Sequence, residues 1–209
     1  MKTYLLSALA AVVAVALVVS GCAKTQNDQS EPAEDPVVKE AAETVAAKDG
    51  RALIVYFSKT GNTEAVANMI AERTGAQLYK VQTVVPYPED DDETVDLAKK
   101  EQNENARPKL ANHVGDMEKF DVIFFGYPNW WGTIPMAMFT FLEEYDLAGK
   151  TIIPFCTHGG GGMENSEEDI AKLAPDSNLL KGLSIRGEDA RNAQADVDKW
   201  LADLGMSAE

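Results

Sequence analysis

Three largely apolar runs divide the chain. They are residues 52–57, 121–126 and 150–156. Runs of this length, in which apolar side chains follow one another without alternation, are typical of strands covered on both faces of a sheet. Two weaker runs, residues 76–83 and 179–185, are predicted as further strands, the second of them at an edge.

The segments between these runs carry helical patterns. Apolar positions three or four residues apart mark helices at residues 64–74 and 136–145, and a polar helical stretch ends near Ala106. Ser166 is predicted to begin a capped helix, and residues 190–204 form an amphipathic closing helix. Strands that alternate with helices in this way predict an α/β fold, a doubly wound five-stranded parallel sheet with helices on both faces.

One residue conflicts with this pattern. Pro154 lies inside a run that is predicted as a buried strand, and a proline has no N–H group to offer to a neighbouring strand. We therefore expect Pro154 near the end of its strand.

The N-terminal segment differs from the rest of the chain. Lys2 is followed by an apolar run and then by Val19-Ser20-Gly21-Cys22, which looks like the processing site of a bacterial lipoprotein. We predict a lipoprotein signal peptide at residues 1–21 and a lipid on Cys22. An uncleaved membrane anchor is the alternative, although the apolar run is short for a span of about 20 residues. Either arrangement places the rest of the chain outside the cytoplasm, attached to the cell membrane.

Residues 22–50 have the composition of a spacer. They are rich in Ala, Glu, Lys, Asp and Pro and contain no aromatic residue. Such a segment cannot bury enough apolar surface to offset the entropy lost on folding, so we predict a flexible acidic tether. Residues 51–209 have an ordinary length for one domain with a single core.

Composition and charge argue against several functions. The formal net charge of −15 disfavours a nucleic-acid partner. The chain has only two cysteines, so a lipid on Cys22 leaves Cys156 without a disulfide partner, and we expect a buried thiol there. Two histidines are too few for most metal sites, so no metal is expected. The Gly-x-Ser-x-Gly turn of many serine hydrolases is missing.

A hydroxyl-rich turn follows the first predicted strand. Its sequence is Ser58-Lys59-Thr60-Gly61-Asn62-Thr63, and a helix follows at once. A turn of this kind directs backbone N–H groups and hydroxyls to one place beside the positive end of a helix dipole, which suits a phosphate. On these residues alone, a simple helix-capping turn is the alternative.

Two further loops of unusual composition follow the next two buried strands. They read Tyr127-Pro128-Asn129-Trp130-Trp131-Gly132-Thr133 and Thr157-His158-Gly159-Gly160-Gly161-Gly162. The carboxyl ends of parallel strands meet at one edge of a sheet, so the three loops are expected to lie together. A phosphate cradle, two aromatic side chains and a bare backbone are what a flat ring on a phosphorylated chain requires, and FMN is such a molecule. Packing of the two tryptophans in the core is the alternative.

In these three loops, and in the order of its elements from Ala52 to Leu204, the chain resembles the flavodoxin family. The resemblance implies a parallel sheet of order 2-1-3-4-5 and FMN as the cofactor. It also implies that the phosphate is held by Ser58, Lys59, Thr60, Gly61, Asn62 and Thr63, although the Lys59 side chain is expected to face solvent. The ring and ribityl chain are expected to contact Pro128, Asn129, Trp130, Trp131, Gly132 and Thr133, with Trp131 stacked on the ring. The pyrimidine side of the ring is expected to contact Thr157, His158, Gly159 and Gly160.

The resemblance implies a redox flavoprotein and leaves its type open. An electron carrier would pass single electrons to a partner protein or a small acceptor, and this type is favoured because the tryptophans would cover the ring. The alternative is an FMN-dependent NAD(P)H oxidoreductase acting on quinones or azo dyes, and a third reading is a lipoprotein that uses the pocket for another ligand. The third loop lacks the acidic residues and stacking tyrosine of small electron-carrier flavodoxins, so their potentials and partners do not transfer. Stacking on tryptophan and negative surroundings are expected to lower the reduction potential of the flavin.

Overall fold

The computed structural model of this protein describes residues 51–206. The expected signal peptide at residues 1–21, the tether at residues 22–50 and the lipidation site Cys22 lie outside the described residues. Each helix in residues 51–206 is too short or too polar to cross a membrane.

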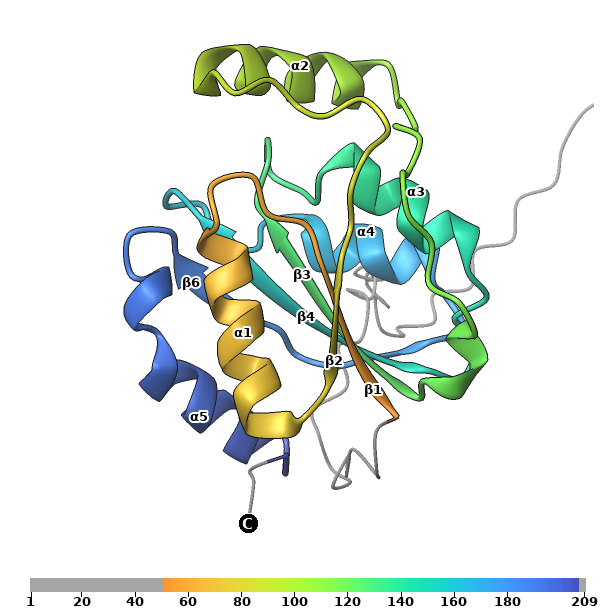
Figure 1. Cartoon of the computed structure of the whole chain (residues 1–209), viewed down its shortest axis with the longest axis vertical. Coiled ribbons are helices and arrows are strands. Elements are labelled where there is room, and N and C mark those ends of the chain that lie inside the picture. The colour runs from red at the N-terminus through yellow and green to blue at the C-terminus, as the bar shows by residue number, and fades with distance from the viewer. Residues whose placement is uncertain (1–50, 207–209) are drawn as a thin grey trace, which may run out of the picture. The chain divides into compact units, whose positions relative to one another are not determined.

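Parallel strands form one sheet in the middle of the domain (Figure 1). Their order is β2-β1-β3-β4-β5, which confirms the predicted order, and a sixth strand, β6, also pairs with β4. The strands are β1 (Ala52–Tyr56), β2 (Gln77–Lys80), β3 (Val122–Pro128), β4 (Thr151–His158), β5 (Asn178–Leu179) and β6 (Leu183–Arg186). The central strands β1, β3 and β4 are the three apolar runs of the sequence.

Helices cover both faces of the sheet, as predicted. α1 and α5 pack on the face that carries Ile54 and Phe124, whereas α3 and α4 pack on the face that carries Val55 and Phe125 (Figure 1). The helices are α1 (Asn62–Thr74), α2 (Asp91–Asn103), α3 (Met136–Glu144), α4 (Ser166–Leu173) and α5 (Gln194–Asp203), and short 3₁₀ turns lie at Met117–Lys119 and Ala190–Asn192. The predicted closing helix therefore begins with a 3₁₀ turn and continues as α5.

Helix α2 stands apart from both layers (Figure 1). Of its side chains only Thr94 and Ala98 are buried. The helix is connected instead to the loop after β3, because the indole Nε1 of Trp131 donates to the Val95 carbonyl at 3.0 Å. Gln102 Nε2 donates in turn to the Trp131 carbonyl at 3.0 Å. Polar contacts of this kind place α2 beside the carboxyl edge of the sheet.

The last predicted strand, at residues 179–185, is two short strands rather than one. β5 pairs with Thr151 and Ile152 at the start of β4, and β6 begins to pair with β4 only at Phe155. The gap between the two partners falls beside Pro154.

Pro154 explains this gap. The expectation that it lies near the end of its strand is wrong, because it lies in the middle of β4. Leu180 N donates to the Ile152 carbonyl at 2.9 Å, so the backbone groups of Ile152 point toward the last strands. Backbone groups two residues apart in a strand point to the same side, so those of Pro154 point toward the last strands as well. Pro154 has no N–H group on that side, and the strand ladder is interrupted where that group would be needed.

Helix α4 begins at Ser166 as predicted, but Ser166 does not cap it. The N-cap residue is Asn165, and no side chain bonds to the first turn. The buried Ser166 hydroxyl donates to the Met163 carbonyl and accepts a 2.8 Å hydrogen bond from the Tyr127 hydroxyl. The serine thus joins α4 to the end of β3.

Candidate functional site

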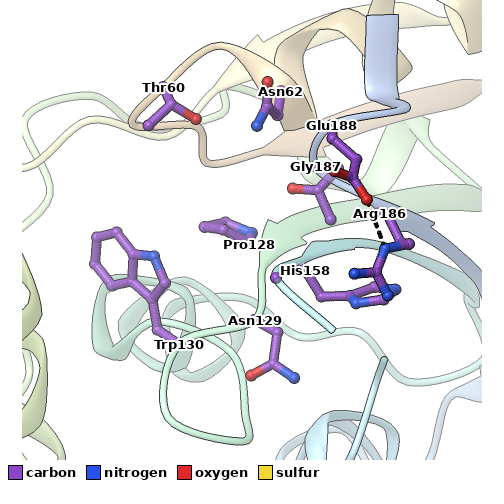
Figure 2. A pocket seen from close by; sticks show the side chains of 11 residues that line it. Thr60, Asn62, Pro128, Asn129, Trp130, His158, Arg186, Gly187 and Glu188 are labelled. Carbon is purple, nitrogen blue, oxygen red and sulfur yellow. Dashed lines mark hydrogen bonds and ion pairs between the residues drawn. The ribbon is translucent and has the colours of Figure 1, made fainter. Parts of the chain in front are cut away.

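A cavity of about 340 Å³ lies among the loops that follow β1, β3, β4 and β6 (Figure 2). Figure 2 shows Thr60 and Asn62 of the first loop across the cavity from Asn129 and Trp130 of the second. Eight residues expected from the sequence line it: Thr60, Asn62, Pro128, Asn129, Trp130, Thr157, His158 and Gly159. The structure therefore brings the three expected loops together at one edge of the sheet.

A second hollow, of about 490 Å³, adjoins the cavity. Asn129, His158 and Gly159 line both spaces. Three further expected residues, Trp131, Gly132 and Gly160, line the second hollow. The remaining expected residues, Ser58, Lys59, Gly61, Thr63 and Thr133, line neither space.

The first loop presents the start of α1 to the cavity. Gly61 has a φ of 87°, a left-handed conformation that glycine adopts without strain. Helix α1 then begins at Asn62, and its N-cap residue Gly61 has no side chain that could bond to the first turn. The first backbone N–H groups of a helix lack intrahelical partners, and of these Glu64 N donates to Ser58 Oγ. These N–H groups and the positive end of the helix dipole favour an anion beside Thr60 and Asn62.

Two hydroxyls of the first loop hold it in place. The buried Thr63 hydroxyl lies 2.8 Å from the Thr157 hydroxyl, which joins the start of α1 to the end of β4. Ser58 Oγ accepts a 3.3 Å hydrogen bond from Glu64 N. Ser58 therefore bonds to the first turn of α1, whereas Thr60 and Asn62 line the cavity.

The Lys59 side chain is directed away from the cavity. Its ammonium donates to the Glu89 carbonyl at 2.9 Å and lies 3.5 Å from the Asp91 carboxylate. Both partners are at or just before the start of α2. Lys59 therefore connects the first loop to α2.

The loop after β3 is a two-residue hairpin turn. Trp130 N donates to the Thr133 carbonyl at 2.9 Å, and Thr133 N donates back to Trp130 at 3.3 Å. The two residues between them, Trp131 and Gly132, have φ values of 55° and 83°. Positive φ at both positions defines a type I′ turn, and it is a strained conformation for a tryptophan.

This turn separates the two tryptophans. Trp130 lines the cavity, and its ring packs edge-on against Phe57 at 5.3 Å and Tyr87 at 5.0 Å between centroids. Trp131 projects toward α2, where Lys99 Nζ lies 4.8 Å from the ring centroid, and its side chain is half exposed. Trp130 therefore forms the aromatic wall of the cavity and Trp131 lines the second hollow, and the stacking of Trp131 on the ring stays a prediction.

Asn129 joins the second loop to the third. Its amide Nδ2 donates to the Gly162 carbonyl at 2.7 Å and to the Glu164 carboxylate at 3.0 Å. Its Oδ1 accepts from Gly132 N at 2.9 Å, and its own N–H donates to the Thr157 carbonyl at 2.8 Å. Because these bonds join the second loop to the third, Asn129 fixes the distance between these two walls of the cavity.

The third loop fixes the orientation of His158. Gly160 N donates to His158 Nδ1 at 2.9 Å. A backbone N–H can only donate, so Nδ1 is unprotonated and the neutral ring carries its proton on Nε2. His158 therefore offers Nε2–H as a hydrogen-bond donor beside both spaces.

A fourth loop, not expected from the sequence, completes the cavity. Arg186, Gly187 and Glu188 follow β6 and line its wall. Gly187 N donates to the His158 carbonyl at 2.9 Å, and Arg186 pairs with Glu188 at 2.9 Å. A Cβ at Gly187 would come within 2.9 Å of the Asn62 side chain, so glycine permits this close approach. Ligands of such folds bind beyond the carboxyl ends of parallel strands, and this rule could have identified the loop after β6 from the sequence.

Two buried titratable side chains, Cys156 and Tyr127, lie near the ends of β4 and β3. Cys156 is buried as expected, and this burial raises the pKa of its thiol to about 12. Burial likewise raises the pKa of the fully buried Tyr127 hydroxyl far above its usual value. Within residues 51–206 no cluster of three or more His, Cys, Asp or Glu side chains is arranged to hold a metal ion.

The fold and the loops define a class of protein: an α/β domain with a ligand cavity at the carboxyl edge of a 2-1-3-4-5 sheet. Residues 51–204 match the family model described as flavodoxin, so the chain belongs to the flavodoxin family. The family expected from the three loops is thereby confirmed.

Solved structures support this assignment. A protein from Bacteroides eggerthii, described as a flavoprotein, is 31% identical with a TM-score of 0.65 over 75% of this chain and 98% of its own. One from Bacteroides uniformis is 30% identical with a TM-score of 0.64 over 74% and 99%. A Lactobacillus acidophilus flavoprotein in complex with FMN is 23% identical with a TM-score of 0.58 over 73% and 99%. No curated protein matched the chain.

Proposed function

We propose that this chain binds FMN and transfers electrons while tethered to the outer side of the cell membrane through a lipid on Cys22. The observation that carries the FMN proposal is the cavity itself. It is lined from the start of α1, the Trp130 ring and the glycine-rich third loop, and a second hollow shares Asn129, His158 and Gly159 with it. These are the features that a phosphate, a linear chain and a flat ring need in succession.

The chain's own residues fit the parts of FMN. The first N–H groups of α1, with Thr60 and Asn62, would hold the phosphate. Trp130 would cover the ring from the second loop, and Gly159 and Gly160 would let the backbone approach its pyrimidine edge. The L. acidophilus flavoprotein, which has this fold, was crystallised with FMN.

Bound FMN would supply the redox chemistry, and the protein would orient the ring and exclude water from one side of it. His158 would donate a hydrogen bond from Nε2, because its Nδ1 is already an acceptor for Gly160 N. The Cys156 thiol would remain protonated beneath the site and take no part in the chemistry, since burial raises its pKa to about 12.

One-electron transfer to a partner protein or small acceptor is the function we favour. Trp130 packs edge-on against Phe57 and Tyr87, which also contact each other, so it would form a fixed aromatic wall that covers part of the flavin ring. The acidic chain, with its net charge of −15, would attract a partner with a basic surface.

An FMN-dependent NAD(P)H oxidoreductase is the second candidate. The second hollow, with the exposed Gly159, Gly160 and Gly161 on its wall, favours it because a hydride donor must reach one face of the ring. The two candidates differ in how the bound flavin is reduced. In a stepwise dithionite titration, a carrier accumulates one-electron-reduced flavin, whereas a reductase is reduced rapidly by NADH and then turns over a quinone or azo dye.

The membrane attachment rests on the sequence of the first 22 residues. A lipid on Cys22 and the acidic tether of residues 22–50 would hold the domain near the membrane surface and allow it to move. Metabolic labelling with a fatty acid, followed by separation of membrane and aqueous fractions, tests this part of the proposal independently of FMN.

A further inference from the structure

A single arginine in the described part of the chain is left without a carboxylate partner. Each of the other four arginines pairs with one: Arg51, Arg73, Arg107 and Arg186. Arg191 makes no hydrogen bond or ion pair within residues 51–206, although the chain carries 34 acidic residues against 19 basic ones. An exposed arginine that remains unpaired among so many carboxylates is free to bind another anion.

Arg191 lies beside the expected phosphate position. It belongs to the 3₁₀ turn Ala190–Asn192, which follows the fourth loop of the cavity. A Cβ added at Gly61 would lie 3.7 Å from its terminal nitrogen Nη2. The guanidinium is therefore next to the residue that precedes α1, where the N–H groups of the helix are open.

The lysine of the first loop is occupied elsewhere. Lys59 donates to the Glu89 carbonyl and pairs with Asp91 near the start of α2. Arg186 is held by Glu188 on the wall of the cavity. Arg191 is consequently the free cation nearest to the start of α1 among the residues that line or adjoin the cavity.

We infer that Arg191 binds the phosphate of the flavin and makes the site selective for phosphorylated over unphosphorylated flavin. This inference rests on the proposed FMN function and adds a charged residue from the last loop to the phosphate site. A guanidinium can donate two parallel N–H bonds to phosphate oxygens, and such charge-assisted bonds are stronger than those of hydroxyls or amides. Arg191 would approach the phosphate from beside Gly61, next to the start of α1.

The test compares FMN with riboflavin, which has the same ring and ribityl chain but no phosphate. Dissociation constants are measured by fluorescence titration for the full-length chain and for R191Q, R191K and K119Q. Lys119 carries the same charge but precedes β3, at the opposite edge of the sheet, so K119Q is the matched control. Thermal unfolding of each variant verifies that it is folded.

We expect R191Q to weaken FMN binding about tenfold and riboflavin binding less than twofold, because only FMN offers a charged partner. R191K should lie between R191Q and wild type, and K119Q should match wild type for both flavins. Equal FMN affinity in wild type and R191Q, or an equal loss for both flavins, would overturn the inference while leaving the proposed function intact. A wild-type chain that binds neither flavin would contradict the proposed function, and the inference with it.

Discussion

Gly126 occupies a position in β3 where a single methyl group should disrupt the sheet. It is paired in register with Phe155 of β4, and the Phe155 side chain is fully buried. A Cβ at Gly126 would lie 2.1 Å from Cζ of that ring and 2.4 and 2.7 Å from its two Cε atoms. These distances are far below van der Waals contact, so the substitution Gly126→Ala must displace the ring or the strand.

The expected loss of folding stability is large because neither the Phe155 ring nor strand β3 can move freely. The ring packs in the core beneath α1 and α5, and β3 lies between β1 and β4. Overpacking a core usually costs about 1–3 kcal/mol, and this overlap with a rigid ring should reach at least about 3 kcal/mol. For a domain of this size, that loss lowers Tm by roughly 6–12 °C. Urea unfolding followed by circular dichroism would measure it.

Two controls make the reasoning refutable. Gly115→Ala should change the free energy of unfolding by less than about 0.5 kcal/mol, because a Cβ there meets no atom within 4 Å. Phe155→Ala removes the clashing ring at its own cost of about 3–5 kcal/mol, so adding Gly126→Ala to it should cost about 1 kcal/mol or less. Additive costs in the double variant, or a stable single Gly126→Ala variant, would show that the clash does not exist.

Three further predictions concern the site and the membrane anchor. Trp130→Ala should weaken FMN binding about tenfold and Trp131→Ala less than threefold, since Trp130 lines the cavity, whereas Trp131 lines the second hollow and bonds to α2; equal effects in flavin fluorescence titrations would contradict this assignment. The raised pKa of Cys156 means that the folded chain retains a proton that the unfolded chain loses above pH 9.0. Stability should therefore fall by roughly 1 kcal/mol more between about pH 8 and pH 10 in wild type than in Cys156→Ala, and parallel urea midpoints in the two would refute the burial argument. Cys22→Ser should accumulate as an uncleaved precursor without fatty-acid label, and a labelled variant would exclude lipidation at Cys22.

Most of the fold follows from the apolar pattern of the chain. The three runs at residues 52–57, 121–126 and 150–156 form central strands, because a sheet covered on both faces buries successive apolar side chains such as Phe124 and Phe125 on opposite faces. The division of the last strand did not follow, although its cause was visible in the sequence. Pro154 interrupts hydrogen bonding on one side of β4 only, and the effect appears in the partner strand rather than in β4 itself.

The sequence predicted which loops form the site, but not which of their side chains face the cavity. The turn at Trp131-Gly132 requires positive φ at two residues. The sequence Asn-Gly predicts such a turn, whereas Trp-Gly does not. This turn decides which tryptophan faces the cavity. The fourth loop was missed because Arg186 and Glu188 have the composition of an ordinary solvent-exposed surface, and only the position of the loop after β6 assigns them to the site.

The measurement that tests the central claim most directly is the visible spectrum of the purified full-length chain after incubation with FMN and removal of free flavin by gel filtration. The cavity among the four loops predicts that flavin absorption bands elute with the protein, near one FMN per chain, and that flavin fluorescence is quenched by Trp130. A colourless protein fraction, with the flavin eluting entirely as free FMN at undiminished fluorescence, would contradict the proposal that this domain is a flavoprotein.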